Sequence, residues 1–484
     1  MTSDADLTEL DCKIKELFPG EAVNKGLSKI GILSSRSLPS FVSDWLISRY
    51  SRDNELDTFS LQKFLDMYLP DQSKANEIKH SLYSERKKVK ILAKFSVEPD
   101  IKTGEARLAI SLLDIKGKEG GVVPSVASDN PELLNGGSWG IGELLWDEGE
   151  KRGEGKVNLI SFKKFQPYSA DLGYYREARK KFDTVTEWID FLLKAMGYDP
   201  RAFSDVMQKL NMTSRLLPFV EPRINIIELA PKSTGKSFVF GRLSKYGWLI
   251  SGGSVSRAQL FYDISKKQPG IITRFDYIAL DEIQTIKFSN PEEVIGALKG
   301  YLEAGEYKIS GYHGEAGAGF VLLGNIPLTY DNRPRDVIYT KSLPPFMQES
   351  AFLDRFHGLL EGWKLPRVTE GSIGDGYAIN SDYFSEVLHE LRKDTIPSSI
   401  VSEFLNVPSD ADKRDTTAIK RLATGYIKLL FPHIRDAKDL DVQDFRTYCY
   451  NPAYAMRSRM RKQLSLMDEE FKEKMPDIKI IGLR

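Results

Sequence analysis

The chain has 484 residues, enough for about three domains. Its 41% apolar and 28% charged residues exclude a disordered or fibrous protein, and 68 basic residues balance 68 acidic ones, so any nucleic-acid surface must be a local patch. The two cysteines and five histidines suggest neither a disulfide framework nor a Cys/His metal site. We find no bilayer-spanning apolar run, and the acidic residues 1–6 do not resemble a signal peptide, so we expect a cytoplasmic protein without a membrane anchor.

The first part of the chain contains two segments of different periodicity. Residues 1–88 place apolar side chains at spacings of three and four, as in 61–65, and we expect a helical domain there. In residues 89–170 the stretches 90–97 and 106–113 read as strands. Because glycines break this segment into short apolar pieces, we predict a small β-rich domain, an OB-like barrel.

The rest of the chain predicts a sheet followed by helices. Residues 171–370 alternate helical patterns with strands expected at 224–229, 277–280 and 320–324, and such apolar strands suit a parallel sheet buried on both faces. Residues 371–484 are mostly helical and end in a charged tail. The predicted fold class is a multidomain α/β protein with a P-loop core, an N-terminal helical and barrel region, and a C-terminal helical domain.

A phosphate-binding motif directly follows the first of these strands. Residues 230–237 fit the P-loop pattern except that Ala230 replaces its first glycine. In such a loop, backbone N–H groups and the start of the next helix surround a triphosphate. Gly235 would allow the backbone to approach the phosphates closely, Lys236 would supply positive charge to the β- and γ-phosphates, and Ser237 would offer a hydroxyl to Mg²⁺. The expected nucleotide-binding residues are Ala230, Pro231, Lys232, Ser233, Thr234, Gly235, Lys236 and Ser237.

Each element of the predicted site also has a plain structural alternative. The loop could be an ordinary turn with a surface lysine. The predicted strand directly before the motif and the helix directly after it favour a P-loop instead. Asp281 would bind the metal and Glu282 would polarise the attacking water, although two acids after a strand are also common in turns. Asn325 could orient the same water or be a turn residue. Arg355 could pair with Asp354, or reach the nucleotide of a neighbouring protomer in a ring.

The order of these elements resembles that of AAA+ ATPases, and the resemblance extends to one family. The segments that carry it are 18–20, 188–190, 228–237, 279–284, 324–327 and 352–358. Together they resemble the BrxL family, the Lon-like AAA+ ATPases of BREX phage-defence systems, over nearly all of the chain. The resemblance implies ATP and Mg²⁺ as cofactors and an ATP-driven ring that engages DNA, similar in architecture to MCM helicases.

The resemblance also assigns roles by position. The residues are Lys236 and Ser237 of Walker A, Asp281 and Glu282 of Walker B, Asn325 as sensor 1, Arg355 as the arginine finger, and Arg414 where a sensor 2 arginine would lie. Ser237 and Asp281 would bind Mg²⁺, and the catalytic residues would be Glu282, Asn325, Arg355 and Arg414. Longer BrxL proteins carry a C-terminal Lon-like protease domain. This sequence ends without it, so we expect a short form without protease activity.

A first place for DNA contact is the segment 305–314. Its alternating pattern between glycines predicts a β-hairpin that projects into the pore of a ring. Lys308 and His313, with Tyr307 and Tyr312, could contact phosphate and sugar there. The alternative is a solvated hairpin without a ligand.

Two other basic segments could contact DNA. Lys87 and Lys88 lie at the entrance of the predicted barrel, although charge runs are usually solvated. The basic cluster 457–462 could bind phosphate or merely cap a helix against 468–470. We find no base-reading motif in these segments, so backbone contacts should dominate and affinity should fall steeply with salt.

The leading hypothesis is a DNA-binding ATPase that forms a homo-oligomeric ring, hexamer-like or larger, as a single or a stacked double ring, and acts with other BREX proteins. One alternative is an ATP-gated assembly scaffold that recruits defence proteins with little hydrolysis. Another is an unfoldase-type partner, which peptides rather than DNA would stimulate.

Overall fold

The computed structural model describes residues 7–29, 31–34, 38–52, 55–100, 105–134, 137–149, 155–165, 168–265 and 267–481. The chain forms two compact units, and each is described by itself. Unit 1 comprises residues 1–26, 39–41 and 170–484, and unit 2 comprises 27–38 and 42–169. Each unit contains a hydrophobic core of its own. Within the described ranges, no helix combines the length and the apolar character that crossing a bilayer requires.

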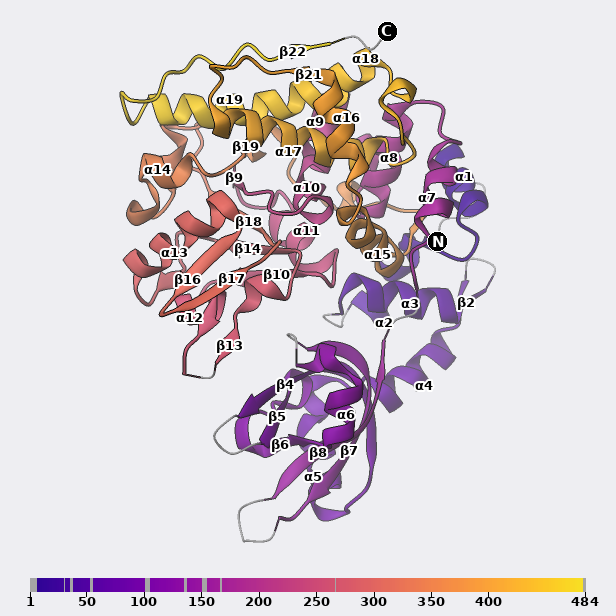
Figure 1. Cartoon of the computed structure of the whole chain (residues 1–484). Coiled ribbons are helices and arrows are strands. Elements are labelled where there is room, and N and C mark those ends of the chain that lie inside the picture. The colour runs from indigo at the N-terminus through magenta and orange to yellow at the C-terminus, as the bar shows by residue number, and fades with distance from the viewer. Residues whose placement is uncertain are drawn as a thin grey trace. The chain divides into compact units, whose positions relative to one another are not determined.

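The centre of unit 1 is a five-stranded parallel sheet (Figure 1). In sheet order its strands are β10 (Gly247–Ser251), β14 (Tyr277–Asp281), β18 (Gly319–Asn325), β9 (Ile226–Ala230) and β19 (Gly358–Glu361). All residues of β9 and β14 are buried, as expected of parallel strands covered on both faces. The three predicted strands are confirmed, and β10 and β19 are additional.

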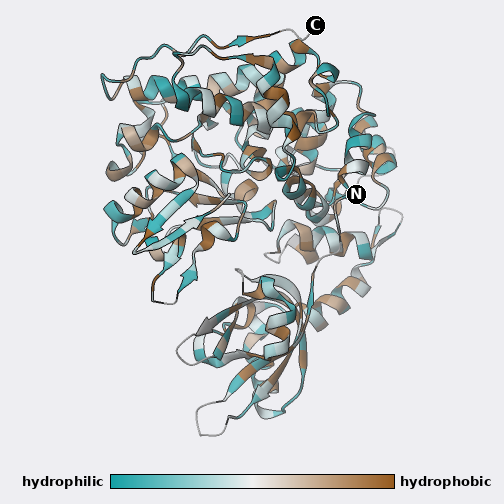
Figure 2. Cartoon of the chain, in the orientation of Figure 1, coloured by the Kyte–Doolittle hydropathy of each residue, from teal (hydrophilic) through white to brown (hydrophobic). Residues whose placement is uncertain are grey.

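Helices surround this sheet and form the C-terminal part of unit 1. The longer ones are α8 (Val185–Ala195), α11 (Lys236–Arg242), α13 (Pro291–Ala304), α15 (Ser381–Arg392), α16 (Ile396–Phe404), α17 (Lys413–Leu430) and α19 (Asn451–Ser465). Figure 2 shows hydrophilic and hydrophobic ribbon alternating along α17 and α19, the pattern of helices with one buried face. The side chain of Asp412 caps α17 by accepting from the Arg414 and Asp415 amides, which fixes where this helix begins. The predicted helical character of 371–484 is confirmed.

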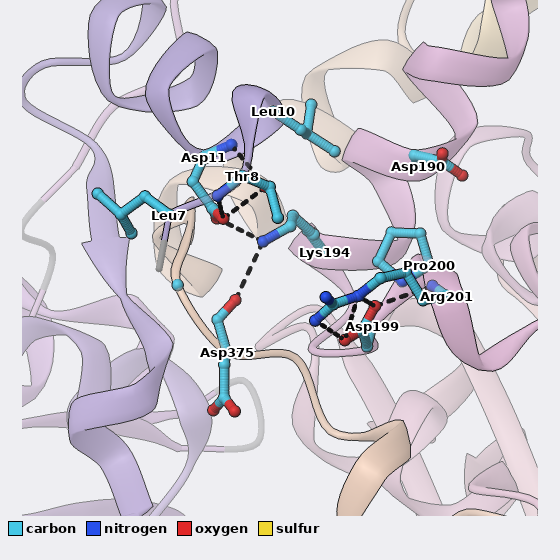
Figure 3. Close-up of a pocket in the computed structure, with 11 residues that line it drawn as sticks. Leu7, Thr8, Leu10, Asp11, Asp190, Lys194, Asp199, Pro200, Arg201 and Asp375 are labelled. Carbon is cyan, nitrogen blue, oxygen red and sulfur yellow. Dashed lines mark hydrogen bonds and ion pairs between the residues drawn. The ribbon is translucent and has the colours of Figure 1, made fainter. Parts of the chain in front are cut away.

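The N-terminal helix α1 (Glu9–Leu17) is held in unit 1 by a buried ion pair (Figure 3). Lys194 on α8 pairs with Asp11 and donates a second hydrogen bond, of 3.0 Å, to the Asp375 carbonyl. Asp11 also accepts from the Tyr377 amide at 2.7 Å. Burial alone would raise the pKa of Asp11, but hydrogen bonds from Lys194 and Thr8 outweigh it, so the pKa lies below its ordinary value. Thr8, Asp11, Lys194 and Asp375 border a cavity of about 440 Å³.

Unit 2 consists of a closed five-stranded barrel and several helices. The barrel strands are β4 (Val89–Asp100), β5 (Glu105–Ile110), β6 (Gly120–Val122), β7 (Ser138–Asp147) and β8 (Lys156–Lys164). The helices of four or more residues are α2 (Gly31–Ser34), α3 (Ser40–Tyr50), α4 (Thr58–Tyr68), α5 (Ala75–Ser84) and α6 (Pro124–Asp129). The first two residues of α3 belong to unit 1. The barrel order is β4-β5-β6-β8-β7, and β6 and β8 are its parallel pair. Alternate residues of β4, such as Ile91 and Phe95, fill the interior. The predicted β-barrel is confirmed.

We expect Lys194→Met to destabilise unit 1 by about 3 kcal/mol, because it leaves the Asp11 carboxylate buried without its cation. Since the pKa of Asp11 is lowered, this contribution is present at neutral pH and is lost as pH falls through the native pKa. The difference from wild type should therefore shrink in acid. Thermal unfolding at several pH values measures it, with Lys180→Met, at an exposed pair with Glu177, as the control. Equal midpoints for the two variants would contradict a role for the buried pair.

Candidate active site

The loop 230–237 lies between the end of β9 and the start of α11, as the P-loop pattern predicts. Ser233 and Gly235 adopt left-handed backbone angles, with φ of 64° and 77°. A Cβ atom on Gly235 would fall 2.2 Å from the hydroxyl oxygen of Tyr198, so only glycine fits at this position. Lys232 and Ser233 are exposed, whereas Thr234 is buried. The loop therefore folds tightly onto unit 1 while keeping part of its backbone open to a ligand.

Lys236 is buried at the base of this loop. Its ammonium donates to the carbonyls of Ala230 and Pro231, at 3.3 and 3.1 Å, and lies 3.5 Å from the side-chain oxygen of Asn325. Burial lowers the pKa of Lys236, and the nearby Glu228 carboxylate opposes that effect. A phosphate group beside the loop would meet an ammonium that the loop already positions.

Two acids and an amide complete this edge of the sheet. Asp281 ends β14 and accepts a 2.5 Å hydrogen bond from the Ser237 hydroxyl. Glu282, the next residue, is exposed and has a φ of 49°, which directs the chain away from the strand. Asn325 ends β18, where it lies in register with Ala230 of β9. The structure thus brings together the five predicted residues from three different strand ends.

Mg²⁺ and a nucleoside triphosphate fit the side chains and backbone groups present at this site. Mg²⁺ prefers hard oxygen ligands, keeps several waters and is commonly shared with phosphate oxygens. The hydroxyl of Ser237 and the carboxylate of Asp281 are two such ligands at hydrogen-bond distance from each other. In the described ranges, we find no group of three or more His, Cys, Asp or Glu side chains able to hold a metal ion by themselves. Water molecules and the phosphate oxygens of a bound nucleotide would complete the shell of a Mg²⁺ ion held by Ser237 and Asp281.

A fully buried ion pair, which was not predicted from the sequence, lies beneath the loop. Arg215 binds the Glu228 carboxylate through two nitrogens, at 2.6 and 3.0 Å, and both side chains have no exposed surface. The same guanidinium donates to the carbonyl of Thr234 at 2.8 Å. The sequence signal that could have indicated this pair was Glu228, a charged residue inside an otherwise apolar strand. Arg215 therefore ties the strand before the loop to the loop itself.

The predicted arginines lie together at a second place in unit 1. Glu303 of α13 pairs with Arg355 at 3.1 Å and with Arg414 at 2.8 Å, and Arg414 also pairs with Asp354 at 2.8 Å. Arg355 additionally bonds the Ala351 carbonyl. These described partners of the two arginines all lie outside the loop 230–237. The neighbouring Asp354 pairs with Arg414 and not with Arg355, so the alternative of an internal ion pair holds for Arg355, but with Glu303 as its partner and not Asp354.

Comparison with known proteins agrees with this geometry. Residues 157–477 match a family model described as Lon-like protease BrxL-like, ATPase domain, and residues 16–146 match the BREX system Lon protease-like protein BrxL N-terminal model. The chain belongs to the BrxL family. A Lon-like protease BrxL of Escherichia coli O9:H4 (strain HS) is 31% identical over 466 residues, 94% of this chain and 65% of that protein. One of Bacillus cereus (strain H3081.97) is 29% identical over 471 residues, 95% of this chain and 67% of that protein. The chain thus spans about two thirds of these curated relatives, and its ATPase domain fits an AAA+ core.

The hairpin predicted for this BrxL-family chain is confirmed. β16 (Glu306–Ile309) pairs with β17 (Tyr312–Glu315), and Lys308 lies directly opposite His313 with both side chains exposed. Tyr307 is only 3% exposed and its ring lies 5.3 Å from that of Phe261, so its predicted contact with DNA is wrong. Lys308 and Arg355 line the same pocket, of about 570 Å³.

The other two basic segments differ in their surroundings. Lys87 and Lys88, in unit 2, are exposed, and Lys87 pairs with Glu85 at 2.6 Å. Arg457, in contrast, is fully buried and pairs with Asp354 and Asp415. Of the two alternatives for 457–462, phosphate binding does not suit Arg457, and its partners are not the acids at 468–470.

We expect Arg215→Met to lower both the stability of unit 1, by about 3–5 kcal/mol, and the affinity for nucleotide, by about tenfold. The double variant Arg215→Met/Glu228→Leu replaces the ion pair with apolar groups and should regain most of the stability. It still lacks the donor for the Thr234 carbonyl, so its nucleotide affinity should remain low. Thermal unfolding and titration with a fluorescent ATP analogue measure the two effects. Wild-type affinity in the double variant would show that Arg215 supports only the fold.

Proposed function

We propose that this chain is a DNA-associated ATPase of a BREX system, which works as a homo-oligomeric ring with ATP bound between protomers. The observation that carries the proposal is the convergence of the loop 230–237, Asp281, Glu282 and Asn325 at one edge of the sheet. A P-loop, a strand-end acid pair and a neighbouring polar side chain are the parts that nucleotide hydrolysis requires. The family's ATPase domain covers all of them.

Each of these residues would have a distinct task. The backbone of the loop and the Lys236 ammonium would hold the phosphates, and Ser237 and Asp281 would hold Mg²⁺. The bound metal would neutralise charge that develops on the phosphates. Glu282 is exposed beside this site, where it would orient the attacking water through a hydrogen bond and then accept its proton. Asn325 would fix the position of the same water or of the γ-phosphate.

The arginine cluster supports the assignment of a site shared between protomers. Arg355 and Arg414 are gathered by Glu303, and their described partners lie apart from the loop of their own protomer. In a closed ring, one surface of each protomer faces a different surface of the next. Arg355 would thus reach the γ-phosphate of the neighbour, and Arg414 would assist it. Glu303 keeps both side chains positioned in the absence of that phosphate.

A mixing experiment tests this shared site. We expect Lys236→Ala to lose nucleotide binding and Arg355→Ala to keep binding but lose hydrolysis, by a factor on the order of 10³–10⁵ if it resembles known arginine fingers. In mixed rings, a site is complete where an Arg355→Ala protomer holds ATP and a Lys236→Ala protomer supplies the finger. About a quarter of the interfaces in an equal random mixture meet this condition. Steady-state phosphate release should therefore recover on mixing.

A matched mixture controls for protomer exchange. Glu282→Gln should bind ATP without turnover, and it alters the same site as Lys236→Ala, so mixing these two variants should restore nothing. Full activity of Arg355→Ala alone would contradict the shared site. Assembly on ATP without turnover in the wild type would favour the scaffold alternative.

Association with DNA is the part of the proposal that rests on the hairpin. Lys308 and His313 face the same side and would contact the phosphate backbone, and other BREX proteins would supply what distinguishes phage DNA from host DNA. Two acids, Glu306 and Glu315, lie opposite each other on the same face of the hairpin, which limits its attraction for DNA.

We expect Lys308→Ala to weaken duplex binding uniformly across sequences and to reduce its salt dependence by about one phosphate contact. Filter binding or fluorescence anisotropy at two salt concentrations measures both. Lys393→Ala, at an exposed pair with Glu390, is the control and should leave binding unchanged. An equal loss in both variants would mean that only overall charge matters.

A further inference from the structure

Unit 2 contains a pocket of about 620 Å³ on the outside of its barrel. Along β4, the side chains of Ile91, Ala93 and Phe95 belong to the barrel core. Leu92 alternates with them and so points outward, yet it is fully buried and lines the pocket. The other contributions come from α3, α4, β7, β8 and the residue after β8. A surface that is usually solvated on a barrel is here partly enclosed by helices.

Four aromatic rings line this pocket, and each is partly exposed. The ring of Trp45 lies 5.1 Å from that of Phe165 and 5.7 Å from that of Phe64, in edge-to-face contacts. Phe64 in turn lies 5.0 Å from Tyr68. These contacts between rings hold the aromatic side chains in position, because edge-to-face packing is a favourable geometry for aromatic pairs. Their remaining exposed surface is available to a planar ligand.

Four cations surround these rings. The side chains of Arg49, Lys90, Lys163 and Lys164 are exposed and line the same pocket. The guanidinium of Arg49 lies 5.4 Å from the ring of Trp45, and Lys164 lies 4.0 Å from Glu132. No carboxylate is among the described residues that line the pocket. In a chain with no net charge, this is a local excess of positive charge beside apolar rings.

We propose that this pocket binds single-stranded DNA, with bases stacked on Trp45 and its neighbouring rings and phosphates held by the surrounding lysines. Aromatic platforms within a positive groove are how proteins bind single strands without reading sequence. A duplex keeps its base faces stacked, so it offers nothing to the rings. The site lies on the outside of β4, β7 and β8 and is separate in sequence from the hairpin at 306–315. The proposal deepens the proposed function, because it assumes that the chain associates with DNA.

The test compares a labelled oligothymidylate of about 12 nucleotides with a duplex of equal length, by fluorescence anisotropy of the full chain at two salt concentrations. We expect Lys163→Glu/Lys164→Glu to weaken single-strand binding at least tenfold and to flatten its salt dependence. The control Lys116→Glu/Lys118→Glu makes the same charge change on exposed residues of unit 2 that do not line the pocket, and it should bind like wild type. Trp45→Leu should weaken binding roughly 5- to 100-fold without altering the salt dependence, because it removes stacking but no charge.

Each other outcome overturns a definite part of the proposal. An equal loss in the two double-lysine variants would assign binding to overall charge, and unchanged binding in Trp45→Leu would exclude stacking at this pocket. If Lys308→Ala alone abolished single-strand binding, the pocket assignment would fail while DNA association stood. If neither DNA form bound the wild type, DNA association itself would fail, and the mixing experiment on ATP hydrolysis would still stand or fall independently.

Discussion

The shared edge of three parallel strands is the constraint on which the nucleotide site depends. β9, β18 and β14 run in the same direction, and their pairing sets Asn325 beside Ala230. A loop that leaves β9 therefore meets the acids that end β14. The buried pair of Arg215 with Glu228 secures this arrangement from below, because its third hydrogen bond reaches the loop carbonyl of Thr234. Such a pair adds little net stability, since both charges are desolvated, but removing one partner is costly. The pair connects the loop to β9 through that hydrogen bond.

A second ionic network connects the arginine cluster to the C-terminal helices. Asp354 accepts from Arg414 of α17 and from Arg457 of α19, and Arg457 also pairs with Asp415. Arg355 directly follows Asp354 in the chain. Because these partners are nearly all buried, the segment that carries Arg355 has little freedom to move without the two helices. A shift of α17 and α19 would thus be transmitted to Arg355, which gives the C-terminal helices a physical route to the proposed shared site.

The parts of this structure that the sequence predicted are those with short-range signals. The P-loop, the acids after β14, the hairpin with its central Ser310 and Gly311, and the alternating barrel strands each follow from neighbouring residues. β10 and β19 were missed because each is only a short apolar run without a distinct pattern. Arg215 was missed because its partner comes from a different element and only the fold brings them together. The burial of Tyr307 was missed for the same reason. Its ring packs against Phe261, which lies before α13 in the chain, whereas Tyr307 follows that helix.

The path of the chain gives the N-terminal helix a role that its length does not suggest. The chain passes between the two units at four places, after residues 26, 38, 41 and 169. The first of these is secured by α1, through Asp11 and Lys194, and by the pairing of β1 (Ala22–Asn24) with β20 (Tyr377–Ile379). The ion pair of α1 and the pairing of β1 therefore fix, within unit 1, the chain that leads into unit 2.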